Sequence, residues 1–230
     1  MTREVSHFAI EKIVQRAEER FRAECRRLWI STDRLFGVLM LVQWVFAVVV
    51  ALTVSPFGWE GSQRSVHVHV LTAIVLGGVI SSLPLYLIWK RPGEAITRHV
   101  VAAAQMLWSA LLIHLSGGRI ETHFHVFGSL GIIAGYRDWR ILLTATLAVA
   151  GDHLARGVLW PESVYGIVNP EWWRFLEHAF WVVFALAFLI WAGRKSLREM
   201  QQIAEGGAQL EALAEHEWRR TSVLERTAAG

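Results

Sequence analysis

Long uninterrupted apolar runs constrain this chain more than any other feature. Most of them approach the roughly 20 residues that an α-helix needs to cross a bilayer. The runs are continuous rather than alternating, which favours transmembrane helices over a closed β-barrel. With 53% hydrophobic residues and 12 Trp, the chain is also too apolar for an ordinary soluble domain. The sequence therefore predicts an all-α polytopic membrane protein.

Six stretches fit membrane-spanning helices, so we expect a six-transmembrane-helix bundle. The fourth stretch is short, and its first residues must already lie near the apolar zone. A polar turn, Tyr136 to Arg140, separates it from the fifth, and Asp138 there is a suitable N-cap. The expected spans are residues 35–54, 67–89, 96–115, 123–136, 141–159 and 173–191.

Lys and Arg are concentrated on alternate flanks of these spans, and positively charged flanks face the cytoplasm. Both termini are therefore expected in the cytoplasm. Residues 1–34 are predicted to form an amphipathic helix that lies on the membrane surface, pairs with a partner helix or packs on its own protein. Residues 35–193 form the membrane domain, and residues 194–230 a charged helix that leaves it.

Several function classes lack support in the sequence. Cys25 is the only cysteine, which rules out an internal disulfide and a cysteine-based zinc site. No basic face rises above the juxtamembrane charges, so nucleic-acid binding is not expected. The chain has no nucleophile elbow, P-loop or zincin motif, and no catalytic residue is assigned.

Histidines gather at one level of the predicted bundle. Given the orientation above, five spans send imidazoles to the outer side, where ionisable groups are costly and usually functional. Residues two apart on a helix point about 200° away from each other, so only one member of each His-x-His pair faces a common point. The candidate ligands are His67, His69, His114, His123, His125, His153 and His178, with Glu121 and Glu177 beside them.

Three kinds of site fit this histidine layer. A non-haem transition metal (Fe, Cu or Zn) suits imidazole and carboxylate ligands. A haem needs only two axial histidines and leaves the others unexplained. A metal-free polar network would bind a small molecule or respond to pH. The residue spacing alone does not choose among them.

Four segments also carry a resemblance to a known family. They read SGGRIETHFHVFGSL (Ser116 to Leu130), YRDWR (Tyr136 to Arg140), GDHLARG (Gly151 to Gly157) and WPESVYG (Trp160 to Gly166). Their order resembles the N-terminal six-helix membrane sensor region of bacterial signalling proteins, mainly histidine kinases and diguanylate cyclases. The resemblance covers roughly residues 35–195.

The resemblance implies a sensor module in the bacterial inner (cytoplasmic) membrane, with no catalytic domain in this chain. TSVLERTAAG, Thr221 to Gly230, is similar to the segment that leads into a GAF domain. A homodimer and a cytoplasmic output domain of the GAF or kinase type are the implied partners, together with the lipid bilayer. The alternatives are a membrane metalloenzyme with its site at the outer face and a small-molecule receptor without metal.

Overall fold

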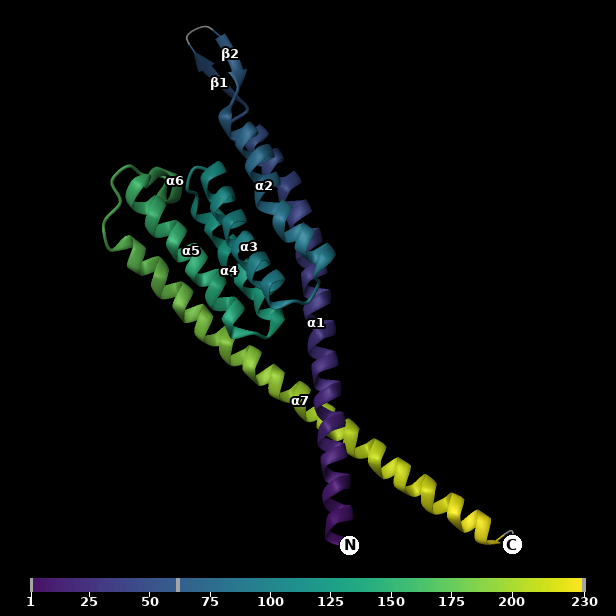
Figure 1. Ribbon diagram of the computed structural model, residues 1–230. Helices are drawn as coiled ribbons and strands as arrows, with labels where there is room; N and C mark the ends of the chain where they lie inside the picture. Colours follow the sequence, from purple (N-terminus) through teal and green to yellow (C-terminus); the bar gives the residue numbers. More distant parts are fainter. Residues whose placement is uncertain (1, 61–62, 229–230) are drawn as a thin grey trace. The chain divides into compact units, whose positions relative to one another are not determined.

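The computed structural model describes residues 2–60 and 63–228. This part of the chain is helical apart from one short antiparallel hairpin, in which Phe57 pairs with Val66. The hairpin was not predicted from the sequence. The elements are α1 (Thr2–Val54), β1 (Phe57–Glu60), β2 (Gln63–Val66), α2 (Val68–Lys90), α3 (Ala95–Leu115), α4 (Ile120–Ile133), the 3-10 turn η1 (Ala134–Tyr136), α5 (Trp139–Leu159), α6 (Glu162–Tyr165) and α7 (Arg174–Ala228) (Figure 1).

Within the described residues, five helices are long and apolar enough to cross a membrane: α1, α2, α3, α5 and α7. This confirms the prediction of an all-α chain with several membrane-length helices. Helix α4 has only 14 residues, and its crossing stays a prediction.

The chain divides into two compact units. One comprises residues 28–194 and contains every candidate ligand. The other comprises the described residues up to 27 and from 195 onward.

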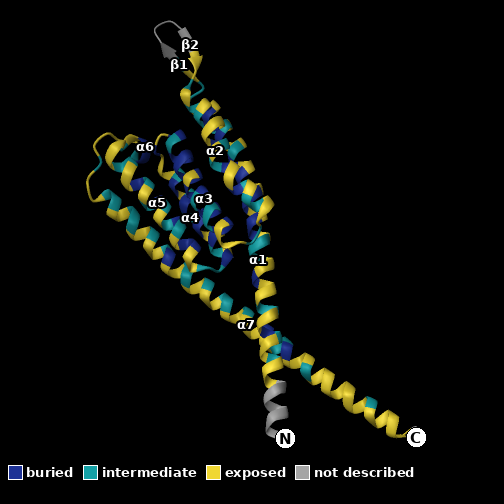
Figure 2. Ribbon diagram, viewed as in Figure 1, coloured by how far each residue is buried: buried dark blue, intermediate teal, exposed yellow. Residues whose placement is uncertain are grey.

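Helix α3 forms the centre of the 28–194 unit. Its buried residues include Trp108 and Gln105, both fully enclosed, and Figure 2 shows this helix mostly in the colour of buried residues. Helices α2, α4 and α5 pack around it. Gly77 of α2 lets two indole rings approach, because a Cβ at this position would lie 2.8 Å from both Trp44 and Trp108. Small residues thus set the close packing of α2, as expected for membrane helices.

Polar contacts at both ends show that α3 and α5 run parallel. At their starts, the Arg98 guanidinium lies 2.8 Å from the Asp138 carboxylate. At their ends, Nδ1 of His114 lies 3.0 Å from Oγ of Ser163, just after α5. Helix α4 with η1 therefore returns along the length of its neighbours. Asp138 also accepts a hydrogen bond from the Arg140 amide at 3.1 Å, which confirms its role as the N-cap of α5.

The other unit pairs the beginning of α1 with the end of α7. Arg16 lies 2.7 Å from Glu215, and Arg20 forms an ion pair with Glu211. The buried hydrophobic residues of this unit are small ones: Ala17, Cys25, Ala204 and Ala208. The beginning of α1 thus packs on the chain's own C-terminal helix, and contact with the membrane surface or with a partner helix stays a prediction.

Candidate functional site

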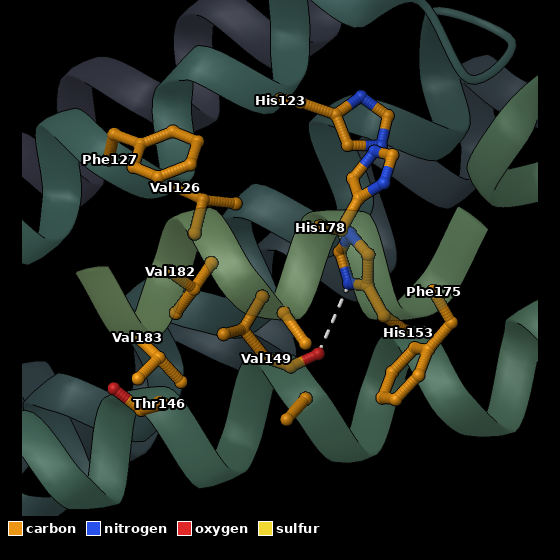
Figure 3. A pocket seen from close by; sticks show the side chains of 12 residues that line it. His123, Val126, Phe127, Thr146, Val149, His153, Phe175, His178, Val182 and Val183 are labelled. Atoms are coloured by element: carbon orange, nitrogen blue, oxygen red, sulfur yellow. Dashed lines mark hydrogen bonds between the residues drawn. The ribbon is translucent and has the colours of Figure 1, made fainter. Parts of the chain in front are cut away.

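Three imidazole rings from three helices come together in the 28–194 unit. The ring centroids of His123 (α4) and His178 (α7) are 5.4 Å apart, and those of His123 and His153 (α5) are 5.6 Å apart. The third side of this triangle, His153 to His178, measures 6.4 Å. Figure 3 shows the three side chains directed toward one another. We call His123, His153 and His178 the histidine triad.

Each triad histidine uses the same ring nitrogen to hold its orientation. Nδ1 of His123 lies 3.0 Å from the Arg119 carbonyl oxygen, four residues earlier on the chain. Nδ1 of His153 is 3.1 Å from the Val149 carbonyl, and Nδ1 of His178 is 2.9 Å from the Arg174 carbonyl. A carbonyl oxygen only accepts, so Nδ1 carries the proton in all three rings.

The opposite nitrogens, Nε2, consequently carry free lone pairs in the neutral rings. Among the buried side-chain atoms of the described residues, Nε2 of His123 has no hydrogen-bond partner. An Nδ1–H donated to a backbone carbonyl with Nε2 left open is the usual arrangement of a metal-ligating histidine. The triad therefore presents three electron-pair donors of one kind.

Ring spacing shows how near the triad is to a metal site. With metal–nitrogen bonds of about 2.1 Å in tetrahedral geometry, three ring centroids would be roughly 5 Å apart. Two sides of the triangle are close to that value, and the third is longer. No group of three His, Cys, Asp or Glu within residues 2–60 and 63–228 is arranged to hold a metal ion as it stands.

A small apolar cavity adjoins the triad (Figure 3). Its volume is about 100 Å³, enough for a few non-hydrogen atoms. An open groove of about 640 Å³ lies between α4 and α7 and shares His123 and His178 with that cavity. The cavity is lined by the triad and by Val126, Phe127, Thr146, Val149, Ala150, Phe175, Ala179, Val182 and Val183.

His125, only two residues from His123, belongs to a different polar group. Its Nε2 lies 2.9 Å from the amide nitrogen of Gln43 in α1, which must be the donor. Its Nδ1 lies 2.8 Å from Oγ of Ser109 in α3. Both ring nitrogens are therefore engaged. We call His125, Gln43, Ser109, Ser129 and Gln105 the glutamine–serine network; in it, Gln105 donates to Ser129 over 2.9 Å.

The remaining candidate histidines form a third group. The ring centroids of His67 and His69 are 4.3 Å apart, and those of His69 and His114 are 5.0 Å apart. Nδ1 of His67 accepts from the backbone amide of His69 at 3.1 Å and caps α2. In its neutral form His67 therefore carries the proton on Nε2, which leaves no lone pair there for a metal.

The two candidate carboxylates lie apart from one another. Glu121 is exposed and lies 3.6 Å from Nε of Arg119. Glu177 lines the open groove next to His178. A third carboxylate, Asp152, is held by Arg156 at 2.5 Å and lies 3.4 Å from Nδ1 of His153. Glu177 is the carboxylate best placed to meet a molecule that reaches the triad from the groove.

A glycine contact supports the end of the bundle that carries the triad. Gly118, at φ +73°, precedes α4, and Gly166, at φ +68°, follows α6. A Cβ on Gly118 would lie 2.3 Å from the Gly166 amide nitrogen. Two left-handed glycines in close approach therefore fix the turn from which α4, with His123, begins.

Sequence reasoning missed the partners of these histidines. Gln43 and Ser163 come from distant parts of the chain, and no local spacing links either of them to a histidine. Ser109 and Gln105 are polar residues four apart in a membrane-length helix, a spacing that is typical of a side facing the bundle interior. Their association with His125 required the structure.

Comparisons with known proteins give one distant similarity. The chain is 30% identical to transducer protein Htr8 of Halobacterium salinarum, over 60% of this chain and 23% of that protein. It thus spans less than a quarter of the length of this relative. No protein-family model matches the chain, and no solved structure matches it. The similarity is to a protein of signal transduction, which agrees in general terms with the resemblance noted from the sequence.

Proposed function

We propose that this chain is the membrane sensor module of a signal-transduction protein and that its stimulus binds to the Nε2 atoms of the histidine triad. One observation carries the proposal: three helices each direct an imidazole with a free lone pair to one apolar place. Of the three, Nε2 of His123 is buried without a partner, and such a lone pair is unfavourable by about 1–3 kcal/mol. The triad is therefore suited to an electron-pair acceptor, either a metal ion or a hydrogen-bond donor.

A transition-metal ion is the first acceptor that we propose. Imidazole nitrogen suits Zn, Cu and Fe, and the backbone carbonyls already orient His123, His153 and His178 as they do in metal sites. When bound, such a metal would supply a charge that draws the three rings together. The protein's own part is to keep Nδ1 protonated, orient the rings and exclude water with Val149 and Val182.

Haem and a metalloenzyme are less well supported by the geometry. If His153 and His178 were the two axial ligands, the macrocycle would have to lie between them, and His123 lies within 5.6 Å of both rings. A hydrolytic metal site needs a nearby carboxylate as base. Glu121 and Asp152 are each paired with an arginine, which leaves Glu177, next to His178 in the groove, as the one candidate base among these three carboxylates.

Helix α7 offers the route from the site to the output. His178 and the charged segment after residue 194 belong to one uninterrupted helix, Arg174–Ala228. A stimulus that binds one packing of α4, α5 and α7 better than another shifts the balance between them. The displacement of α7 would pass to its C-terminal part and, in the full protein, to an output domain of the GAF or kinase type in a homodimer.

Six membrane crossings with both termini in the cytoplasm remain part of this proposal. The support is the parallel course of α3 and α5, since α4 and η1 must return over the same distance. Residues 120–136 form that return, and as a helix they would span about 25 Å. A bacterial inner membrane is the setting that the resemblance implies.

The test is metal binding by the purified chain, measured by elemental analysis after chelation and reloading with zinc, copper or iron. We expect one bound ion per chain, lost in His153→Gln and retained in His125→Gln. Hydrogen exchange of residues 195–228 should change on loading if α7 carries the signal. Equal metal content in both variants would contradict a triad site.

A further inference from the structure

The groove between α4 and α7 leads from the surface of the bundle to the histidine triad. It is lined by His123, His178 and Glu177 and by the large apolar side chains Phe124, Phe127, Trp181 and Phe184. Trp181 is 52% exposed and Phe184 is 51% exposed. If α4 and α7 both cross the bilayer, as proposed above, these side chains face lipid and the groove opens sideways toward the membrane.

The polar groups along this groove share one chemical character. Nε2 of His123 and Nε2 of His178 accept, because both rings use Nδ1 as the donor. The carboxylate of Glu177 also accepts. The inner cavity adds a third accepting nitrogen, from His153. A molecule bound here must supply hydrogen-bond donors at its head and apolar surface elsewhere.

We infer that the groove binds a lipid-soluble hydroxyaromatic molecule of the hydroquinone type, which reaches the triad from the bilayer. The inference rests on the proposed function, in which the triad is the stimulus site, and it names the class of organic ligand. One hydroxyl donates to one Nε2 of the triad, and a second donates to the carboxylate of Glu177. The ring packs against Trp181 and Phe127, where aromatic contacts are favourable, and an apolar tail follows the groove to lipid.

The same geometry discriminates between redox forms of such a molecule. A hydroquinone carries two hydroxyl donors, whereas the corresponding quinone carries only acceptors. In a bound quinone, the carbonyl oxygens would lie opposite the Nε2 lone pairs of His123 and His178. All of these atoms are acceptors, so no hydrogen bond would form between them, which is unfavourable. The site therefore prefers the reduced form, and its occupancy reports the reduced fraction of a membrane-soluble pool.

The test uses the metal-free chain in lipid nanodiscs and three probes of nearly equal shape. These are a short-chain hydroquinone, its quinone and its dimethyl ether, kept under argon. Quenching of Trp181 follows binding, and Trp181→Phe identifies that residue's share of the signal. We expect the hydroquinone to bind at least about tenfold more tightly than either analogue, because only it donates.

Two substitutions on α7 form a matched pair for the groove itself. Ala185 lines the groove, whereas Ala187 does not and is exposed. Ala185→Phe should weaken hydroquinone binding by about tenfold or more, by filling the space, and Ala187→Phe should leave it unchanged. Circular dichroism checks that both variants keep their helical content. Equal binding of the three probes, or hydroquinone binding unchanged by Ala185→Phe, overturns the inference.

A zinc titration separates this inference from the proposed function. If zinc binds and is lost in His123→Leu while hydroquinone does not bind, the triad remains the site and the hydroquinone inference fails. If neither zinc nor hydroquinone binding responds to His123→Leu, both proposals fail. Hydroquinone binding that zinc displaces, and that His123→Leu abolishes, supports both.

Discussion

His123 and His125 lie on the same helix, two residues apart, and have opposite environments. His123 directs a free Nε2 toward two other imidazoles and an apolar cavity. His125 has both ring nitrogens engaged, by Gln43 of α1 and Ser109 of α3. The helical turn of about 100° per residue produces this separation. A histidine whose hydrogen bonds are complete supports packing, and one with an open nitrogen is available to a ligand.

The largest expected effect is the loss of zinc affinity when a triad histidine is substituted. His123→Gln or His153→Gln should lower zinc affinity by about 100-fold or more, because the outer partners of metal ligands alone contribute 10–100-fold. His125→Gln should lower it far less. A cobalt titration, followed by visible absorption, measures both. Similar losses for His125 and His123 would show that the two histidines do not have separate roles.

The second prediction concerns the glutamine–serine network. Gln43→Leu removes the donor to Nε2 of His125 and should lower the free energy of unfolding by about 1–3 kcal/mol. Zinc affinity at the triad should stay the same. The measurement is reversible unfolding in mixed micelles, with the double variant Gln43→Leu/His125→Leu as control. Independent, additive losses would mean that the two side chains are not coupled.

The third prediction concerns the turn from which α4 begins. Gly118→Ala should destabilise the chain by about 1–3 kcal/mol, because its backbone is left-handed and Gly166 is too close for a Cβ. Gly128 lies within α4, and a Cβ added there would have no neighbouring atom within 4 Å. Gly128→Ala is the matched control and should be neutral or slightly stabilising. Thermal unfolding measures both, and equal destabilisation would contradict the close approach.

The smallest effect is expected in the other unit, where the polar contacts are exposed. The guanidinium of Arg16, which donates to Glu215 and attracts it, lowers the pKa of that carboxyl below its ordinary value of 4.5. Because the pKa of Glu215 is depressed in the folded state, the ion pair stabilises the folded chain at pH values above 4.5. This contribution is lost as the pH falls through the folded-state pKa. Glu215→Gln should remove that part of the acid dependence of the melting temperature. Added salt should also weaken the stabilisation by this ion pair. A stabilisation that does not change with salt would contradict an exposed ion pair.

The sequence predicted the helices better than it predicted the site. Apolar runs and the polar turn around Asp138 were enough to place α2, α3 and α5 within a residue or two of their bounds. The hairpin at 57–66 was missed, because no alternating pattern or Asn-Gly turn marks it. A short connection between two membrane-length helices does not by itself predict strands.

The sequence predicted that the histidines lie at a similar depth along their helices. It did not predict that they form three separate groups. Depth along a helix follows from sequence position, so residues such as His114 and His178 could be placed near one end of the bundle. Which rings meet depends on how each helix is rotated about its axis. That rotation is set by distant contacts such as Trp44 against Gly77 and Arg98 with Asp138. Local spacing in the sequence does not contain this information.

Nitrogen-15 NMR of the histidine side chains tests the central claim most directly. Protonated and unprotonated ring nitrogens have well-separated shifts, and single His→Gln variants assign them. We expect His123, His153 and His178 to have unprotonated Nε2 atoms. Zinc should shift these three signals and leave those of His125 in place. Protonated Nε2 atoms in the triad, or a zinc response at His125 instead, would contradict it.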